Sequence, residues 1–132
     1  MRLFFLRHGQ TVANAACLIQ GQTGGELTPL GIEQAKCAAQ LLKDEHIDVV
    51  YVSDLNRTRQ TAEYILNGRD IKVHYDKRIR EVACGIFEGK PYGSMGEEAR
   101  RVNQDRFTWI PQGGESLAQL RERAACFVES II

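Results

Sequence analysis

The chain has 132 residues, of which 43% are apolar and 26% are charged, a composition typical of one globular domain with a sizeable core. Seventeen basic residues balance seventeen acidic ones, which argues against a general affinity for nucleic acid or anionic membranes, so any anion site must be local. The N-terminal apolar run has only four residues, whereas a membrane helix needs about 20. Four scattered cysteines, with no C-x-x-C pair, predict reduced thiols, and we expect a cytoplasmic protein.

The predicted elements alternate between strands and helices along most of the chain. Thr28 suits a helix N-cap and Pro29 the first helical position, while Ser53 is the expected cap of the next helix. In chain order we expect a strand over 2–6, a loop over 9–26, a helix over 29–45, a strand over 48–52, a helix over 54–67, a strand over 71–75, a loop over 85–93, a short helix over 95–104 and a final helix within 113–132.

Strands that alternate with helices predict a parallel sheet with helices on its faces. In such folds ligands bind at the carboxyl ends of the strands. Arg7, His8 and Gly9 directly follow the first predicted strand, and Arg57 lies shortly after the second. The sequence therefore predicts that these residues share one edge of the sheet.

The residue types at this edge suit phosphoryl transfer. A neutral histidine ring is a nucleophile near neutral pH, which makes His8 the candidate attacking group. The guanidinium groups of Arg7 and Arg57 can bind a phosphoryl group and stabilise its charge during transfer, and Gly9 lets the backbone approach closely. A carboxyl group must then protonate the leaving oxygen, and Glu81 is the candidate general acid.

These residues belong to an ordered set of motifs that covers nearly the whole chain. The stretches are LRHGQTVAN (6–14), QG (20–21), LTPLGIEQA (27–35), YVSDLNRTRQTA (51–62), IREVACGIFEG (79–89) and GGES (113–116). With this set the chain resembles the histidine phosphatase superfamily, also called phosphoglycerate-mutase-like. The resemblance implies one domain over residues 1–132 with a three-layer α/β/α fold and a mostly parallel sheet that lacks its C-terminal strand or strands.

The resemblance also implies roles for individual residues. His8 would accept the phosphoryl group as phosphohistidine, and Glu81 would be the proton donor and acceptor. No metal or other cofactor is implied, and the expected partner is a small phosphorylated substrate rather than nucleic acid or a membrane; the oligomeric state stays open. The remaining pocket residues implied by the motifs are Arg7, Arg57 and Asn14, with Gln20 and Gly21 from a mobile loop.

Two features favour a phosphatase over a mutase within this family. Mutases carry an aromatic- and histidine-containing run after the catalytic glutamate, whereas this chain has Val82-Ala83-Cys84-Gly85. The segments around Glu81 and GGES look most similar to the fructose-2,6-bisphosphatase branch that regulates glycolysis and apoptosis. In that branch Lys90 would contact a second phosphate, while a phosphoglycerate mutase is the alternative activity.

One expected residue has no counterpart. The family carries a second histidine in a later strand of the form V-S-H-G, and neither His46 nor His74 lies in such a motif. We expect either a piece of a longer protein or a naturally short protein. In the second case the chain is a catalytically impaired relative that binds phosphorylated ligands or a partner protein.

Each candidate also has a structural interpretation. His8 can serve as a capping residue, Asn14 as a turn former, and Arg57 or Lys90 as a solvated surface residue. Glu81 can pair with a neighbouring arginine, Arg78 or Arg80. For Tyr92 and Trp109 we favour packing over a role as substrate platforms.

Overall fold

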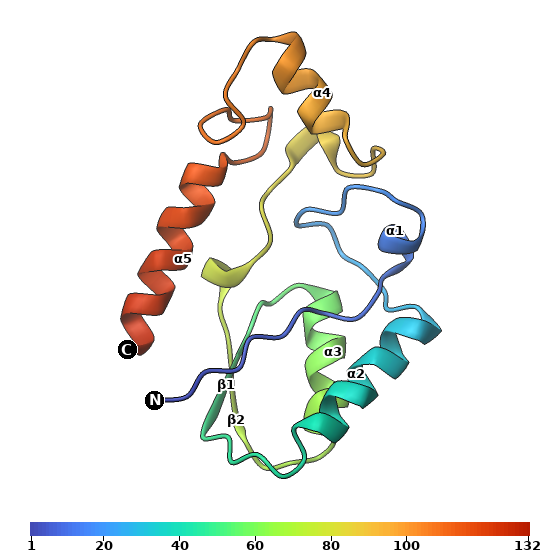
Figure 1. Cartoon of the computed structure of the whole chain (residues 1–132), viewed down its shortest axis with the longest axis vertical. Coiled ribbons are helices and arrows are strands. Elements are labelled where there is room, and N and C mark those ends of the chain that lie inside the picture. The colour runs from blue at the N-terminus through green and yellow to red at the C-terminus, as the bar shows by residue number, and fades with distance from the viewer.

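The computed structural model describes all 132 residues and is shown in Figure 1. The chain forms seven helices and strands and two 3₁₀ turns, and its middle part alternates between helix and strand as expected of an α/β protein. The elements are α1 (Val12–Ala15), α2 (Pro29–Leu41), β1 (Val49–Val52), α3 (Asn56–Leu66), β2 (Lys72–Tyr75), the 3₁₀ turns η1 (Lys77–Ile79) and η2 (Gly85–Phe87), α4 (Ser94–Arg101) and α5 (Leu117–Ile131).

The sheet consists of β1 and β2, which pair in parallel with Val49 opposite Lys72 and Val52 opposite Tyr75. Helices α2 and α3 lie on one side of the sheet and α5 lies on the other (Figure 1). The α5 side is fixed by an aromatic contact, because the Tyr51 ring lies edge-on to that of Phe127 with 5.3 Å between centroids. The expected α/β fold with a parallel sheet is therefore confirmed.

The strand expected over residues 2–6 is wrong in this structure. This segment is the dark blue tube next to the N-terminus in Figure 1, and it takes part in no backbone–backbone hydrogen bond. Its apolar side chains are exposed, with Phe5 at 83%. An apolar run indicates a preference for a sheet, but a strand forms only beside a neighbour that pairs with its backbone. Here β1 pairs with β2 alone.

The helix boundaries follow local capping chemistry. Thr28 caps α2, since its Oγ1 accepts from the Gly31 N–H at 3.1 Å, and Pro29 holds the first helical position, as predicted. The helix ends at Leu41 rather than at residue 45. Ser53 is not the cap of α3: the N-cap position is Leu55, without a side-chain cap hydrogen bond.

The main buried apolar cluster lies outside the sheet. Cys84, Phe87 and Met95 are buried together, and Ile19, Val82 and Trp109 pack against them. The cluster joins η2 to α4 and so fixes the segment that follows Glu81. None of the helices combines the length and the apolar character that a membrane crossing requires.

Candidate active site

Two glycines fix the backbone next to His8. A Cβ atom on Gly9 would lie 2.3 Å from the Gly31 carbonyl oxygen of α2, and one on Gly31 would lie 2.1 Å from the Gln10 carbonyl oxygen. The Gly9 N–H donates to Thr61 Oγ1 of α3 at 3.1 Å. Only hydrogen side chains allow this approach, so the chain after His8 is held against both helices.

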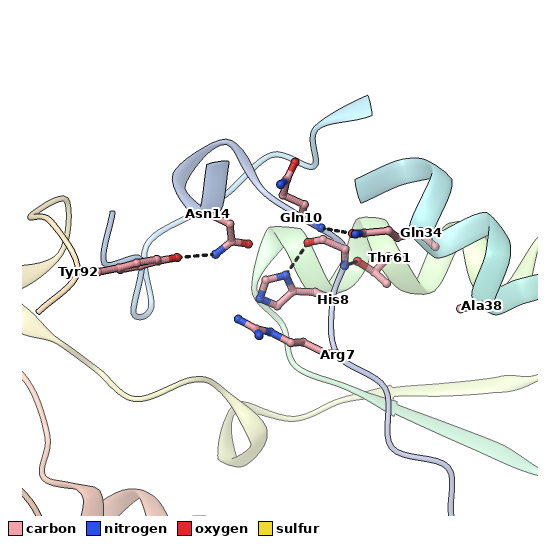
Figure 2. Close-up of a pocket in the computed structure, with 10 residues that line it drawn as sticks. Arg7, His8, Gln10, Asn14, Gln34, Ala38, Thr61 and Tyr92 are labelled. Carbon is pink, nitrogen blue, oxygen red and sulfur yellow. Dashed lines mark hydrogen bonds between the residues drawn. The ribbon is translucent and has the colours of Figure 1, made fainter. Parts of the chain in front are cut away.

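The His8 ring has a defined proton position. Its Nδ1 lies 2.7 Å from the Gly9 carbonyl oxygen, and a carbonyl oxygen can only accept a hydrogen bond. Nδ1 therefore carries the proton, and the lone pair resides on Nε2. Figure 2 shows the His8 ring and the Arg7 guanidinium group pointing the same way, toward the side where Asn14 and Tyr92 lie.

The surroundings keep the His8 ring neutral. Partial burial lowers the pKa of His8 below its ordinary value of 6.5, and the positive charges of Arg57 and Arg7 lower it further. The hydrogen bond to Gly9 and the charge of Glu81 act in the opposite direction but do not reverse the shift. At neutral pH the unprotonated Nε2 is therefore available as a nucleophile.

Arg57 is the most deeply buried cation of the site, with 2% of its surface exposed. Its Nη2 donates to the Gly21 carbonyl oxygen at 2.6 Å and its Nη1 to that of Thr23 at 3.0 Å. A guanidinium group has five N–H donors, so three stay unused, among them the buried Nε. Burial also lowers the pKa of Arg57. Unused buried donors on a cation are typical of a site that receives an anion.

Two neighbouring cavities meet at His8. Arg7, His8, Arg57 and Glu81 all line the smaller one, which has a volume of about 270 Å³. The structure thus brings together the four residues predicted to act as nucleophile, phosphate-binding arginines and general acid. Glu81 is exposed, and its Oε1 accepts from its own neighbour, the Val82 N–H, at 2.7 Å.

The larger cavity, of about 550 Å³, extends from His8 toward Asn14 and Tyr92 (Figure 2). The Asn14 Oδ1 accepts from the Thr11 N–H within the cap of α1, so the amide group is held in place. Its Nδ2 donates to the Tyr92 hydroxyl at 3.3 Å. The Tyr92 ring is 53% exposed and lines the cavity, which corrects our assignment of this residue to packing.

Three predicted pocket residues lie outside both cavities. Gln20 is buried and accepts from the Thr11 hydroxyl at 2.8 Å. Gly21 approaches the site through its carbonyl group, which Arg57 holds. Lys90 places its Nζ 4.7 Å from the centroid of the Phe87 ring. Their roles in substrate binding stay predictions.

His8 is the only histidine that lines these cavities. His46 lies next to Asp48, with its Nε2 3.1 Å from a carboxylate oxygen, and the His74 ring stacks on Tyr51. No three His, Cys, Asp or Glu side chains form a group that could hold a metal ion.

The family model of the histidine phosphatase superfamily (branch 1) matches residues 3–132, so the chain belongs to this family. Among its relatives is a probable phosphoglycerate mutase, GpmB, of Yersinia enterocolitica, which is 36% identical over the whole of this chain. The chain spans 63% of the length of that relative.

Solved structures agree with this assignment. A putative alpha-ribazole-5'-P phosphatase of Escherichia coli has a TM-score of 0.85 at 30% identity, over 94% of this chain and 63% of that one. A mycobacterial glucosyl-3-phosphoglycerate phosphatase, in a complex with VO₃, has a TM-score of 0.78 at 34% identity, over 94% of this chain and 63% of that one. These relatives do not point to the fructose-2,6-bisphosphatase branch in particular, so the family, and not that branch, is shown.

Proposed function

We propose that this chain carries the nucleophile and the phosphate-binding groups of a phosphatase that hydrolyses small phosphomonoesters through phosphohistidine at His8. The observation that carries the proposal is the pairing of His8 with Arg57 in one cavity. Arg57 is buried and holds three unused donors, while the His8 Nε2 carries a free lone pair. A phosphoryl group between the two residues would accept hydrogen bonds from the unused Arg57 donors and present its phosphorus atom to the His8 lone pair.

The reaction follows from the four groups in the cavity. The His8 Nε2 attacks phosphorus, the bond from phosphorus to the ester oxygen breaks, and Glu81 gives its proton to the leaving alcohol. Arg7 and Arg57 stabilise the charge on the other phosphoryl oxygens. Water then attacks the phosphohistidine, Glu81 takes a proton from that water, and the phosphorus–nitrogen bond breaks to release inorganic phosphate.

The covalent intermediate gives a direct test. We expect incubation with a labelled phosphomonoester to give acid-labile, base-stable phosphate on the protein, which His8→Ala abolishes. His46→Ala is the matched control, because His46 is exposed and lies outside both cavities, and it should label like the unmodified chain. If the protein neither becomes labelled nor releases phosphate from any ester, the proposal is contradicted. If such a protein still binds phosphate, the chain is instead a non-catalytic member of the family that binds phosphorylated ligands.

A mutase is the second candidate, favoured by the similarity to GpmB. A mutase moves the phosphoryl group within phosphoglycerate, whereas a phosphatase releases it. Phosphorus NMR of a reaction with 3-phosphoglycerate separates the two, since inorganic phosphate indicates hydrolysis and 2-phosphoglycerate indicates transfer. A sugar bisphosphate belongs in the same substrate panel, with Lys90→Ala to test a second phosphate contact.

A further inference from the structure

All N–H donors of the Arg123 guanidinium group, on α5, bond to Glu115 or to the backbone around Glu81. Its Nη1 donates to the carbonyl oxygens of Arg78, at 2.8 Å, and Arg80, at 2.7 Å. Its Nη2 donates to the Glu81 carbonyl oxygen at 2.9 Å, and Nε and Nη2 also bond to the carboxylate of Glu115. A surface arginine seldom has such a full set of partners, because its side chain is long and flexible.

Glu115 holds the same backbone from the other side. Its Oε1 accepts from the Ala83 N–H at 3.1 Å, and its own N–H donates to the Ala83 carbonyl oxygen at 2.9 Å. The pair with Arg123 keeps the pKa of this carboxyl low, so the group is ionised and a strong acceptor. Both side chains are about one-fifth exposed. The two residues thus bracket the chain before and after Glu81.

The contacts of Arg123 and Glu115 hold a backbone segment that has no regular secondary structure. Residues 80–83 belong to no helix or strand, so their carbonyl groups have no regular partners. The Glu81 side chain makes one hydrogen bond, to the adjacent Val82 N–H, which fixes the carboxyl group only relative to its own backbone. Where that carboxyl lies in the cavity is therefore decided by what holds the backbone.

We propose that Arg123 and Glu115 are a positioning pair that aims the Glu81 carboxyl at the leaving oxygen, an inference that rests on the proposed function. The pair lies on α5 and the turn before it, outside the lining of either cavity. It therefore acts through Glu81 and not on the substrate. Loss of the pair should weaken proton transfer while leaving attack by His8 in place.

The choice of leaving group separates positioning from general stabilisation. A nitrophenolate leaves without protonation, whereas an alkoxide needs the proton of a general acid. The first step, transfer of the phosphoryl group to His8, must be measured alone, because Glu81 also acts in the later attack by water, which both esters share. We expect Arg123→Met to slow single-turnover labelling of His8 on the order of tenfold with an alkyl phosphomonoester and to leave labelling by p-nitrophenyl phosphate nearly unchanged. Glu81→Gln should show the same pattern, and the double variant should lose no more than Glu81→Gln alone. Equal losses of the labelling rate with both esters overturn the proposal.

Arg121→Met is the matched control, since Arg121 lies on the same helix two residues earlier and is exposed. It should behave like the unmodified chain with both esters. If Arg123→Met no longer unfolds cooperatively, Arg123→Lys is tested in its place. Lysine keeps the positive charge beside Glu115 but cannot donate to three carbonyl groups at once.

A second measurement needs no turnover. The Ala83 N–H donates to the Glu115 carboxylate, so hydrogen exchange at this amide reports whether the pair holds the backbone beside Glu81. We expect this exchange to become faster in Arg123→Met and to stay unchanged in Arg121→Met. Unchanged exchange in Arg123→Met overturns the positioning role. A His8→Ala variant that still hydrolyses esters instead overturns the proposed function, and the two failures are thereby distinct.

Discussion

His8, the proposed nucleophile, illustrates how neighbours set the chemistry of one residue. His8 has two influences that favour its neutral form, partial burial and the adjacent guanidinium groups, and two that oppose it, the Gly9 carbonyl and Glu81. Because the first pair dominates, the pKa of His8 is lowered. The two arginines proposed to bind phosphate thus also favour the unprotonated form of the proposed nucleophile.

This charge arrangement predicts the titration of His8. We expect its ring signal in NMR, assigned by its absence in His8→Asn, to titrate with a midpoint below 6.5, because burial and two cations disfavour the protonated ring. Arg7→Gln should raise that midpoint, since one of the cations is removed. A midpoint above 6.5 in the unmodified chain, or a fall in Arg7→Gln, contradicts this account.

Residue roles were predictable only in part. The types and order of His8, Arg7 and Glu81 predicted that they share one site, and the structure places all three in the lining of one cavity; their roles in phosphoryl transfer stay predictions. The carbonyl partners of Arg57 were not predictable, since they come from a loop more than 30 residues away in sequence. Tyr92 was missed because an aromatic residue beside Pro and Gly carries no periodic signal.

Helices and strands were predictable where residues within the same short segment determine them. The helix over α2 follows from its cap and first proline, and β1 and β2 follow from short apolar runs between turn residues. The segment 2–6 has an equally strong apolar pattern but depends on a partner strand. Pairing is a property of the whole sheet, and no window of five residues reports it.

The contact of Gly9 with α2 gives a prediction about stability. Gly9→Ala and Gly31→Ala should each lower the free energy of unfolding by about 1–3 kcal/mol, because each new methyl group meets backbone atoms that cannot yield easily. Denaturant titration followed by circular dichroism measures the change.

Gly24→Ala is the control for these variants, since a Cβ atom there has no neighbour within 4 Å and the backbone is not left-handed. It should be neutral or slightly stabilising. A Gly9→Ala variant as stable as Gly24→Ala shows that the loop and α2 do not approach so closely in solution.

The whole molecule exposes more surface than its mass requires. Its accessible surface is 8382 Å², whereas the scaling for compact proteins gives about 7,000 Å² at this mass. Part of the difference is apolar, as the exposed side chains of residues 3–6 show. Stability should therefore be distributed unevenly, with the sheet and α3 more protected than the N-terminal segment.

Hydrogen exchange tests this distribution. The amides of residues 2–6 should exchange without protection, because none of them has a backbone partner, while those of β1 and α3 should be protected. Mass spectrometry after peptic digestion resolves the two regions. Protection of residues 2–6 contradicts this description and indicates that the segment pairs with another strand in solution.

The two carbonyl groups that hold Arg57 make anion binding and the loop at Gly21 to Thr23 thermodynamically linked. These bonds use two of the five N–H donors, so the loop orients the guanidinium group and leaves the other donors to an anion. If the ordered loop raises the affinity for an anion, a bound anion must stabilise the ordered loop by the same factor. The affinity of this site for free phosphate and the order of the loop should consequently change together.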